Sequence, residues 1–391
     1  MTGQPSGVVA PAGFATAGTA CGIKASGDPD LSLIVADSPV PTAAMFTTSR
    51  TAAPPVVLGR RVLAAGRLRA VVVNSGCANA GTGSAGLADA EMVAAAAAEA
   101  LGAQPGEILV SSTGPIGPRL PVDRIRAALP GLAAAAGRTS DHALLAARGI
   151  MTTDSVPKLA DHEAAGGWRV GGMAKGAGMV RPDLATMLAF VTTDAIVDAG
   201  ELDAVLRGAA DATFNCLNLD GCQSTNDTVL LMASGAAGVR PDPTEFEAAV
   251  TEVCRALSRL MATDAEGASK VVDLSVRGAP GDREARALAM AVADSSLVRA
   301  SFYGADPNWG RVLAALGTAG VDLDPGAVDI AYQGVPVAAG GVGIGTDEDL
   351  VSELLAGDFT VDVVVGKGPG AAAVVTTDLT PDYVRFNGAR S

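Results

Sequence analysis

A threonine near the middle of the chain is placed where it could act as a nucleophile. The glycine-rich stretch KGAGMVRPDLATML leads into an apolar run that begins at Ala185–Thr186. Enzymes that activate a hydroxyl or a thiol usually use a histidine as the base, but the chain contains only His142 and His162, each in a polar stretch. Thr186 can act without a histidine if the bond before it is cut, because its freed α-amine then serves as the base for its own hydroxyl.

Other polar segments could take part in such chemistry. The turn VSSTGPIG could point the Thr113 hydroxyl and the Gly114 N–H at a developing oxyanion, although ordinary strand ends contain similar turns. The cluster DGCQSTNDTV is typical of Asx turns, and DAEGASK places Glu266 at the expected end of a helix. DPNWGR is more typical of a loop or an interface anchor. Residue types alone therefore leave the roles of these segments open.

The glycine-rich stretches and the cysteines do not predict a cofactor or a metal. In GGMAKGAG the residue after the lysine is Gly176, whereas a P-loop needs Ser or Thr there. GKGPGA lies between two expected strands, so no helix follows that could bind a pyrophosphate. The five cysteines are widely spaced and contain no C-x-x-C pair for zinc or for a redox dithiol. We therefore expect no bound cofactor and no metal.

Composition and charge exclude several classes of partner. The chain has 391 residues, of which 49% are hydrophobic but only 3% aromatic, so small aliphatic side chains should form the core. A formal net charge of -14 repels nucleic acid and anionic membranes. The N-terminus lacks the basic and apolar regions of a signal peptide, and we expect reduced cysteines in a cytoplasmic protein.

Strand-like and helix-like segments alternate along the chain, which predicts a layered α/β fold. Short Val/Ile/Leu runs that end in Gly or Ser predict buried strands at 31–38, 69–76 and 106–114. Further apolar runs predict strands at 187–195, 227–234, 270–278, 328–334, 359–366 and 371–379. Amphipathic or alanine-rich runs with start and stop residues predict helices at 84–102, 121–129, 140–150, 199–215, 242–261 and 282–298.

Two finer expectations concern the order of these elements. The stretch 167–185 is rich in glycine and predicts a loop, which makes it the best candidate for an internal boundary. A short glycine-rich connection joins the strands at 359–366 and 371–378, so they should pair antiparallel with each other. The sheets should therefore be mixed and not purely parallel.

A series of motifs along the chain resembles the ornithine acetyltransferase family of arginine biosynthesis, also called glutamate N-acetyltransferase. The resemblance extends from about residue 6 to the C-terminus. The motifs are, in chain order, VVVNSGCANAGTG, SSTGPIG, MTTDSVPK, KGAGMVRPDLATML, DGCQSTNDTVLL, DAEGASK, YGADPNWGRVLAA and YVRFN.

The resemblance implies a precursor that cuts itself at Ala185–Thr186. Residues 1–185 would form an α chain and residues 186–391 a β chain whose N-terminal Thr186 is the nucleophile. The family's fold is αββα-layered, of the N-terminal-nucleophile type with mixed sheets. The two chains would assemble into an α2β2 heterotetramer.

The resemblance also implies roles for individual residues. Thr113 and Gly114 would form the oxyanion hole that stabilises the tetrahedral intermediate. The residues that match the family's substrate contacts are Thr152, Lys175, Thr186, Glu266, Asn387 and Ser391.

The residue types agree with the reaction that the family catalyses, in which acetyl passes from N2-acetylornithine to glutamate. N2-acetylornithine has a carboxylate and an ammonium group, and Lys175 and Glu266 could bind them by charge-assisted hydrogen bonds. An α-amine has a pKa near 7.7–8.0, which suits the general base of a ping-pong transfer through acetyl-Thr186. The implied mechanism needs no cofactor.

Several alternatives remain open at this point. Acetyl-CoA could be a second acetyl donor. Water could replace glutamate as the acceptor, which would make the protein an amidohydrolase or aminopeptidase with the same nucleophile. The chain could also serve a secondary-metabolite pathway, or it could be a scaffold without activity that is never cut.

Overall fold

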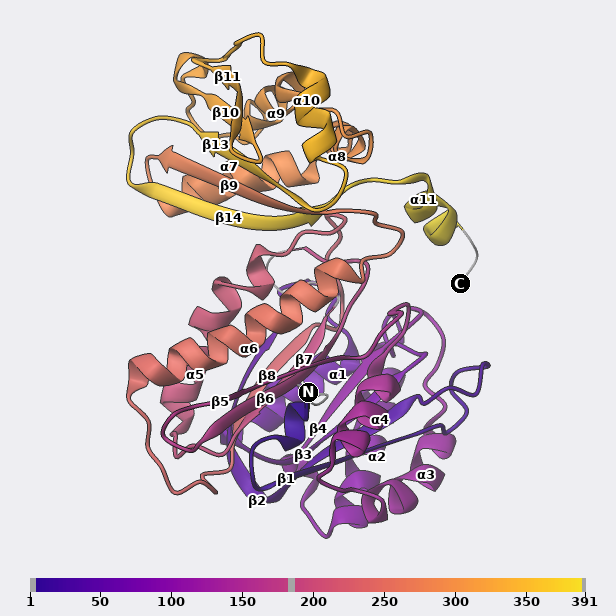
Figure 1. Ribbon diagram of the computed structural model, residues 1–391. Helices are drawn as coiled ribbons and strands as arrows, with labels where there is room; N and C mark the ends of the chain where they lie inside the picture. The colour runs from indigo at the N-terminus through magenta and orange to yellow at the C-terminus, as the bar shows by residue number, and fades with distance from the viewer. Residues whose placement is uncertain (1–4, 182–186, 389–391) are drawn as a thin grey trace. The chain divides into compact units, whose positions relative to one another are not determined.

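The computed structural model describes residues 5–181 and 187–388 (Figure 1). The chain forms two compact units. The first unit consists of Met1–Asn215 and Cys222–Met261, and the second of Cys216–Gly221 and Ala262–Ser391. Each unit is the part of the chain whose residues pack mainly with one another. The limits of the units therefore differ from those of the α and β chains expected from cleavage.

The first unit is built on strands in the order β4–β3–β2–β8–β7–β6–β5. Its strands are β1 (Phe14–Thr19), β2 (Leu31–Phe46), β3 (Arg67–Ser75), β4 (Ile108–Thr113), β5 (Lys158–Glu163), β6 (Arg169–Lys175), β7 (Leu188–Thr193) and β8 (Thr228–Ala233). The long strand β2 joins two sheets, because residues 31–36 pair with β1 while residues 42–46 pair with β8. The β3–β4 and β7–β8 pairs are parallel and the others are antiparallel, so the sheets are mixed as expected.

Both sheets contribute to one apolar core. Val71 of β3 lies in the same buried cluster as Phe190 of β7 and Leu230 of β8. On the opposite face of β6, a side chain at Gly172 would meet Leu257 of α6. The helices of this unit are α1 (Pro54–Val62), α2 (Gly83–Leu101), α3 (Val122–Ala134), α4 (Ser140–Ile150), α5 (Ala199–Asp211) and α6 (Pro243–Thr263). The layered α/β prediction with mixed sheets is thus confirmed (Figure 1).

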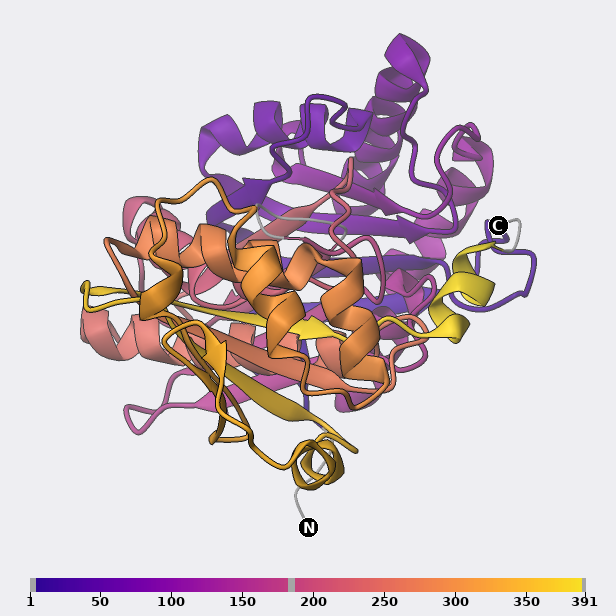
Figure 2. The same ribbon diagram turned by 90° about the horizontal axis from the view of Figure 1, so that it is seen from above.

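The second unit has a sheet in the order β12–β11–β10–β13–β9–β14. Its strands are β9 (Val271–Ala279), β10 (Asp329–Tyr332), β11 (Val335–Ala339), β12 (Val342–Gly343), β13 (Phe359–Val364) and β14 (Gly370–Thr377). Its helices are α7 (Asp282–Asp294), α8 (Ser296–Tyr303), α9 (Trp309–Leu316), α10 (Glu348–Leu354) and α11 (Pro381–Gly388). Helix α7 packs along β9 and β14 and also contacts α9 (Figure 2).

The prediction that 167–185 is a boundary loop is wrong for its first half, and residues 182–185 lie outside the described residues. Residues 169–175 form β6, which lies inside the sheet between β5 and β7. Its glycines serve close packing, since a Cβ on Gly171 would lie 1.9 Å from the carbonyl oxygen of Gly7. The chain crosses between the two compact units at 216–221 and again near Ala262.

The prediction that strands 359–366 and 371–378 pair with each other is also wrong. They lie on opposite edges of β9, where Val361 is the parallel partner of Leu274 and Val374 is its antiparallel partner. The connection between them crosses the end of β9, because the Gly368 N–H donates to the carbonyl of Gly278 at 2.9 Å. A short linker can therefore pass over a third strand.

Helix ends follow local signals to different degrees. Gly102 ends α2 in the left-handed conformation with φ +62°, as its sequence predicts. The start of α2 is misplaced, since its N-cap is Thr82 and not Ser84. The helix expected at 282–298 is two helices, because the Ser295 side chain accepts the Val298 N–H and begins α8.

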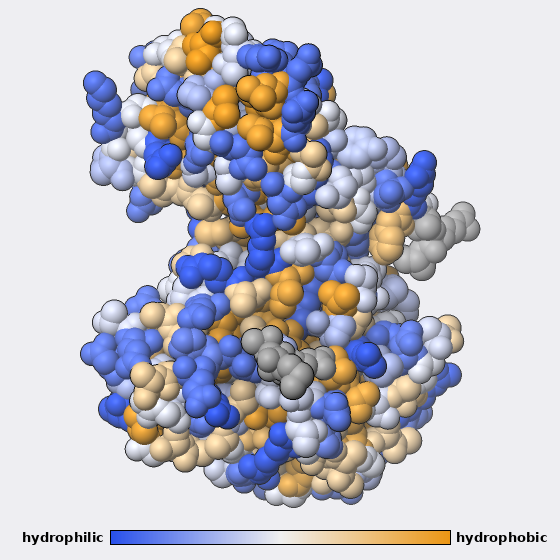
Figure 3. All heavy atoms as spheres, viewed as in Figure 1, coloured by the Kyte–Doolittle hydropathy of each residue, from blue (hydrophilic) through white to orange (hydrophobic). Residues whose placement is uncertain are grey.

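The face of each unit seen in Figure 3 carries hydrophilic and hydrophobic residues intermixed. Exposed apolar side chains on the second unit include Val342, Ile344 and Leu350. Within the described ranges, the helices are too short or too polar to cross a membrane.

Candidate active site

Strand β4 ends in the SSTG turn, residues 111–114, which contains the expected oxyanion donors. Gly114 has φ +138°, and a Cβ at this position would lie 2.5 Å from the Cys77 nitrogen. The Cys77 N–H donates to the Thr113 carbonyl at 3.1 Å, which holds the turn against the neighbouring segment. Only glycine fits this backbone without strain. The turn thus has the tight geometry that the sequence predicts, and its catalytic role stays a prediction.

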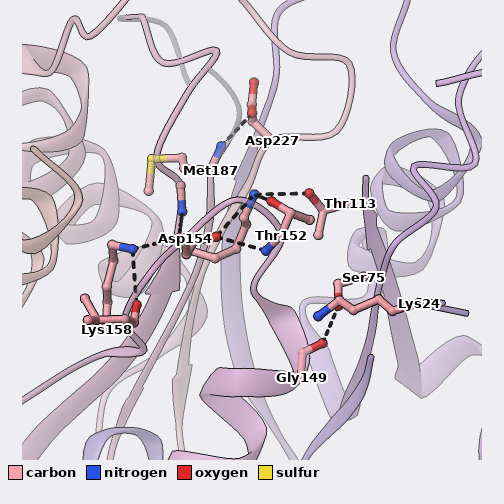
Figure 4. A network of polar contacts seen from close by, with 12 residues as sticks. Lys24, Ser75, Thr113, Gly149, Thr152, Asp154, Lys158, Met187 and Asp227 are labelled. Atoms are coloured by element: carbon pink, nitrogen blue, oxygen red, sulfur yellow. Dashed lines mark hydrogen bonds and ion pairs between the residues drawn. The ribbon is translucent and has the colours of Figure 1, made fainter. Parts of the chain in front are cut away.

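Lys175 lies close to two other residues expected at the site. It is the last residue of β6, pairs with Leu188 of β7, and is only 2% exposed. Its Nζ atom donates to the Thr152 Oγ1 atom at 2.6 Å and lies 3.4 Å from the Thr113 Oγ1 atom. Lys175 is therefore held at the end of a buried strand and is not carried by a loop. Figure 4 shows Thr113 and Thr152 in this network.

A buried carboxylate, Asp154, joins this lysine to a second one. The Asp154 Oδ1 atom accepts hydrogen bonds from Lys158 Nζ and from the Gly176 N–H, both at 2.7 Å. Its Oδ2 atom accepts the Thr152 N–H at 3.0 Å and lies 3.8 Å from Lys175 Nζ. Burial alone would raise the pKa of Asp154, but the charges of Lys175 and Lys158 lower this pKa to about 2. Asp154 is therefore ionised at neutral pH and compensates both lysines.

This network leaves the hydroxyl protons of the two threonines available. A lysine ammonium can only donate, so the oxygens of Thr113 and Thr152 accept from it. Each hydroxyl then keeps its own proton for another acceptor. At the SSTG turn, that acceptor can be an oxyanion, which a nearby ammonium would stabilise further.

The strand that follows the expected cleavage point is anchored by Asp227. This buried carboxyl group accepts the Met187 N–H at 2.9 Å through Oδ1, and Oδ2 has no hydrogen-bond partner within the described ranges. Burial raises the Asp227 pKa well above its usual range. The expected cleavage site Ala185–Thr186 and the expected contact Ser391 lie outside the described residues.

Asn226 connects this anchor to the SSTG turn. Its Nδ2 atom donates to the carbonyl oxygens of Ala78 at 2.7 Å and Ser112 at 2.9 Å. The Ser112 hydroxyl in turn donates to Asn74 Oδ1 at 2.6 Å, and Asn74 Nδ2 donates to the Cys77 carbonyl at 2.8 Å. Three motifs that are far apart in the sequence thus form one buried polar network, which fixes the position of the turn.

A cavity of about 610 Å³ opens beside Thr152 and Asp154. Such a volume is typical of a small-molecule site. It is lined by Lys24, Ser26, Asp28, Pro29, Gly76, Pro115, Arg148, Met151, Thr152, Thr153, Asp154, Ser155 and Pro157.

The second unit brings together the two other expected contacts, Glu266 and Asn387. The Asn387 Nδ2 atom, on α11, donates to the Glu266 Oε2 atom at 3.1 Å. The loop after α6 packs closely on α11, because Gly267 has φ +63° and a Cβ there would lie 2.3 Å from the Tyr383 nitrogen. The structure therefore groups the expected residues into Thr113, Gly114, Thr152 and Lys175 in one unit and this pair in the other.

Both histidines contact residues outside this network. The His142 Nδ1 atom lies 2.6 Å from the Thr139 hydroxyl. The His162 Nδ1 atom lies 3.0 Å from Glu252 Oε2. That neither histidine is the catalytic base stays a prediction. Within the described ranges, no group of acidic, cysteine or histidine side chains could hold a metal ion.

Sequence reasoning missed Asp154, Lys158, Asn226 and Asp227 as parts of the site. Asp154 and Lys158 lie in the motif MTTDSVPK at a spacing of four, which is a signal for an ion pair only if the segment brings them face to face. Asn226 and Asp227 lie in the cluster that was interpreted as Asx turns. Their burial and their partners on other strands could not be read from local spacing.

Comparison with known proteins finds relatives along nearly the whole chain. The model of the ArgJ family matches residues 15–391. The arginine biosynthesis bifunctional protein ArgJ of Thermobifida fusca is 46% identical over 385 residues, covering 98% of this chain and 99% of that protein. The Mycobacterium leprae protein of the same name is 47% identical over 396 residues, covering 99% and 96%.

A solved structure is similar over part of the chain. It is ornithine acetyltransferase complexed with ornithine, from Mycobacterium tuberculosis, with 47% identity and a TM-score of 0.45. The match covers 46% of this chain and 96% of that chain. The family match and the full-length relatives agree with the motifs that meet around the SSTG turn, and this chain belongs to the ArgJ family.

Proposed function

We propose that this protein transfers the acetyl group of N2-acetylornithine to glutamate in the acetyl cycle of arginine biosynthesis, through an acetyl ester on Thr186. Membership of the ArgJ family supports this reaction. The observation that carries it in the structure is the cluster of Thr113, Thr152 and Lys175 beside Gly114. That cluster joins a hydroxyl donor, a backbone turn and a buried cation at one point.

The proposed reaction begins with self-cleavage at Ala185–Thr186. Met187, the residue after Thr186, is held by Asp227, so the new N-terminus would stay next to its strand. Cleavage would yield an α chain of residues 1–185 and a β chain of residues 186–391. We further propose that these chains form an α2β2 heterotetramer and that the enzyme works in the cytoplasm.

The transfer itself has two steps. The α-amine of Thr186 takes the proton of the threonine hydroxyl, and the oxygen attacks the acetamide carbon of N2-acetylornithine. The Thr113 hydroxyl and the Gly114 N–H stabilise the oxyanion, each donor being worth about 3 kcal/mol. Ornithine leaves with the proton, and the amine of glutamate then attacks the acetyl ester to give N-acetylglutamate and free Thr186.

The charges near the site support binding of an amino acid. Lys175 and Thr152 would bind the α-carboxylate, with Thr152 at the cavity wall and Lys175 behind it. In the second unit, Glu266 would take the ammonium group of ornithine and Asn387 would orient Glu266 through their hydrogen bond. Acetyl-CoA as an additional donor is an open part of the proposal.

Mass spectrometry and a transfer assay test the function together. We expect purified protein to give two fragments that meet at residues 185 and 186, and radiolabelled acetyl to pass from N2-acetylornithine to glutamate. Thr186→Ala should stay uncut and inactive. Release of label as free acetate would instead favour an amidohydrolase, and an uncut, inactive wild-type protein would favour a scaffold. A parallel reaction with acetyl-CoA tests that donor.

A further inference from the structure

The cavity beside Thr152 contains two cations to which the proposed reaction gives no role. Lys24 and Arg148 line its wall together with Thr152. They come from separate segments, because Lys24 precedes β2 while Arg148 lies on α4. The acids in the wall are Asp28, which is exposed, and Asp154, which already compensates two buried lysines. Lys24 and Arg148 are therefore the groups of the wall that could bind an anion next to the candidate site.

The loop that carries Lys24 is held in a defined shape. The buried carboxylate of Asp30 accepts the N–H groups of Cys21 at 2.6 Å, Ile23 at 2.6 Å and Lys24 at 3.0 Å. The Lys24 Nζ atom donates to the Pro29 carbonyl at 2.7 Å. An ammonium group has three donors, so this bond orients the amine and leaves further hydrogens for a ligand. Figure 4 labels Lys24 in the same view as Thr152 and Asp154.

A bound anion would stabilise the charged form of the partly buried Lys24 side chain. The Lys24 pKa is lowered, chiefly by burial and in part by the charge of Lys175. Asp28, Asp30 and Asp154 act in the opposite direction. The charges of Lys175 and Asp154 both act on the Lys24 pKa, so Lys24 lies near the candidate site. A carboxylate bound between Lys24 and Arg148 would gain charge-assisted hydrogen bonds in a partly dry cavity.

We infer that Lys24 and Arg148 form a subsite for the second carboxylate of the acceptor, glutamate. This inference rests on the proposed function. The two substrates share an α-carboxylate, but beyond it glutamate carries a second carboxylate where ornithine carries an ammonium group. An acid such as Glu266 attracts that ammonium and repels a carboxylate. The acceptor therefore needs cations of its own, and these two residues line the cavity next to Thr152.

Kinetics of Lys24→Met and Arg148→Met test the subsite. We expect each change to raise the KM for glutamate about tenfold or more, as when a hydrogen bond to a charged group is lost. Release of ornithine from N2-acetylornithine in the first half-reaction should change less than about twofold, because that substrate has no second carboxylate. The preference for glutamate over glutamine as acceptor should fall by a similar factor.

Controls separate this inference from other causes. Arg126→Met removes one exposed positive charge on α3 that does not line the cavity, and it should leave both KM values unchanged. Lys24→Arg should restore much of the glutamate affinity. If Lys24→Met does not fold, the exposed Arg148 carries the test alone. Equal effects on both substrates, or effects on glutamate no larger than those of Arg126→Met, would overturn the subsite.

A binding measurement does not depend on catalysis. Glutarate has the two carboxylates of glutamate without the amine, and calorimetry should show that it binds the wild-type protein about tenfold or more tightly than it binds Lys24→Met. Equal binding to both proteins would overturn the subsite. If glutarate binds wild type more tightly than Lys24→Met but wild-type protein transfers no acetyl group, the proposed function fails and the dicarboxylate subsite stands.

Discussion

The residues expected to bind substrate fall into two regions with opposite character. In the first unit, Lys175 is 2% exposed and belongs to a network in which the side chains of Asp154 and Lys158 are 0% exposed. In the second unit, Asn387 is exposed and contacts Glu266 through one hydrogen bond. The first region forms only when the whole fold forms. The second can change its side-chain conformation without disturbing its unit.

Because of this difference, substitutions in the two regions should affect the stability of the protein to different extents. A buried charge network is costly to break, because removal of one partner leaves an uncompensated charge in a low dielectric. A surface hydrogen bond contributes about 1 kcal/mol or less. We therefore expect substitutions in the first region to reduce folding and activity together. Substitutions in the second should affect activity with little change in folding.

The largest effect is expected for Asp154→Asn. It leaves the buried ammonium of Lys158 and that of Lys175 without a full counter-charge, which should destabilise the protein by about 3–5 kcal/mol. Chemical denaturation measures this. Asp203→Asn breaks the exposed pair with Arg207 on α5 and is the matched control, with an expected change below about 1 kcal/mol. Similar losses for the two variants would contradict the comparison.

A smaller effect is expected for Gly114→Ala. The new Cβ would meet the Cys77 backbone nitrogen at 2.5 Å, so the SSTG turn must shift, at a cost of about 1–3 kcal/mol. The rate at which Thr186 is acetylated should also fall, because the N–H of residue 114 moves away from the oxyanion. Gly117 also has positive φ but open space around it. Gly117→Ala should therefore retain acetylation, and equal losses would show that the turn does not position a catalytic donor.

The dependence of stability on pH should separate two buried acids. The Asp154 pKa is lowered to about 2, so its contribution is full above pH 4 and is lost as pH falls toward 2. The Asp227 pKa is raised, so the folded state favours the protonated carboxyl group. The stability that this group contributes is therefore full at low pH and is lost as pH rises through the raised pKa. As the pH rises above about 4, the pKa of an ordinary aspartate, Asp227→Asn should therefore lose less stability than wild type in thermal unfolding. Parallel curves would contradict the raised pKa.

The smallest effect on stability is expected for Glu266→Gln. The substituted side chain keeps an oxygen that can accept from Asn387, so the change in unfolding free energy should stay below about 1 kcal/mol. The KM for N2-acetylornithine should rise, because the ammonium loses its counter-charge, while the KM for glutamate should not. A large loss of stability would place this pair with the buried network and remove the contrast between the regions.

Local signals in the sequence predicted most elements of the fold. The stop at Gly102 and the apolar runs were sufficient to identify α2 and the central strands. Strand β6 was missed because its glycines were interpreted as loop residues, whereas they permit close contact with the segment around Gly7. The pairing of β13 and β14 was missed because a third strand, β9, lies between them.

The candidate site was predictable only in part. The resemblance identified Thr113, Thr152 and Lys175, and the structure places both threonine hydroxyls within hydrogen-bond reach of the Lys175 ammonium. Asp154 and Asn226 were missed because their importance depends on burial and on partners far away in the chain. Such partners are set by tertiary packing and not by spacing.

The hydrogen bond from the Met187 N–H to Asp227 has a consequence for the proposed cleavage. That amide belongs to the second residue of the proposed β chain, and β7 continues from it with partners on both sides. If the chain is cut as proposed, this hydrogen bond would hold the new β chain by its second residue. Cleavage before Met187 would then leave the pairing of β7 with β6 and β8 in place.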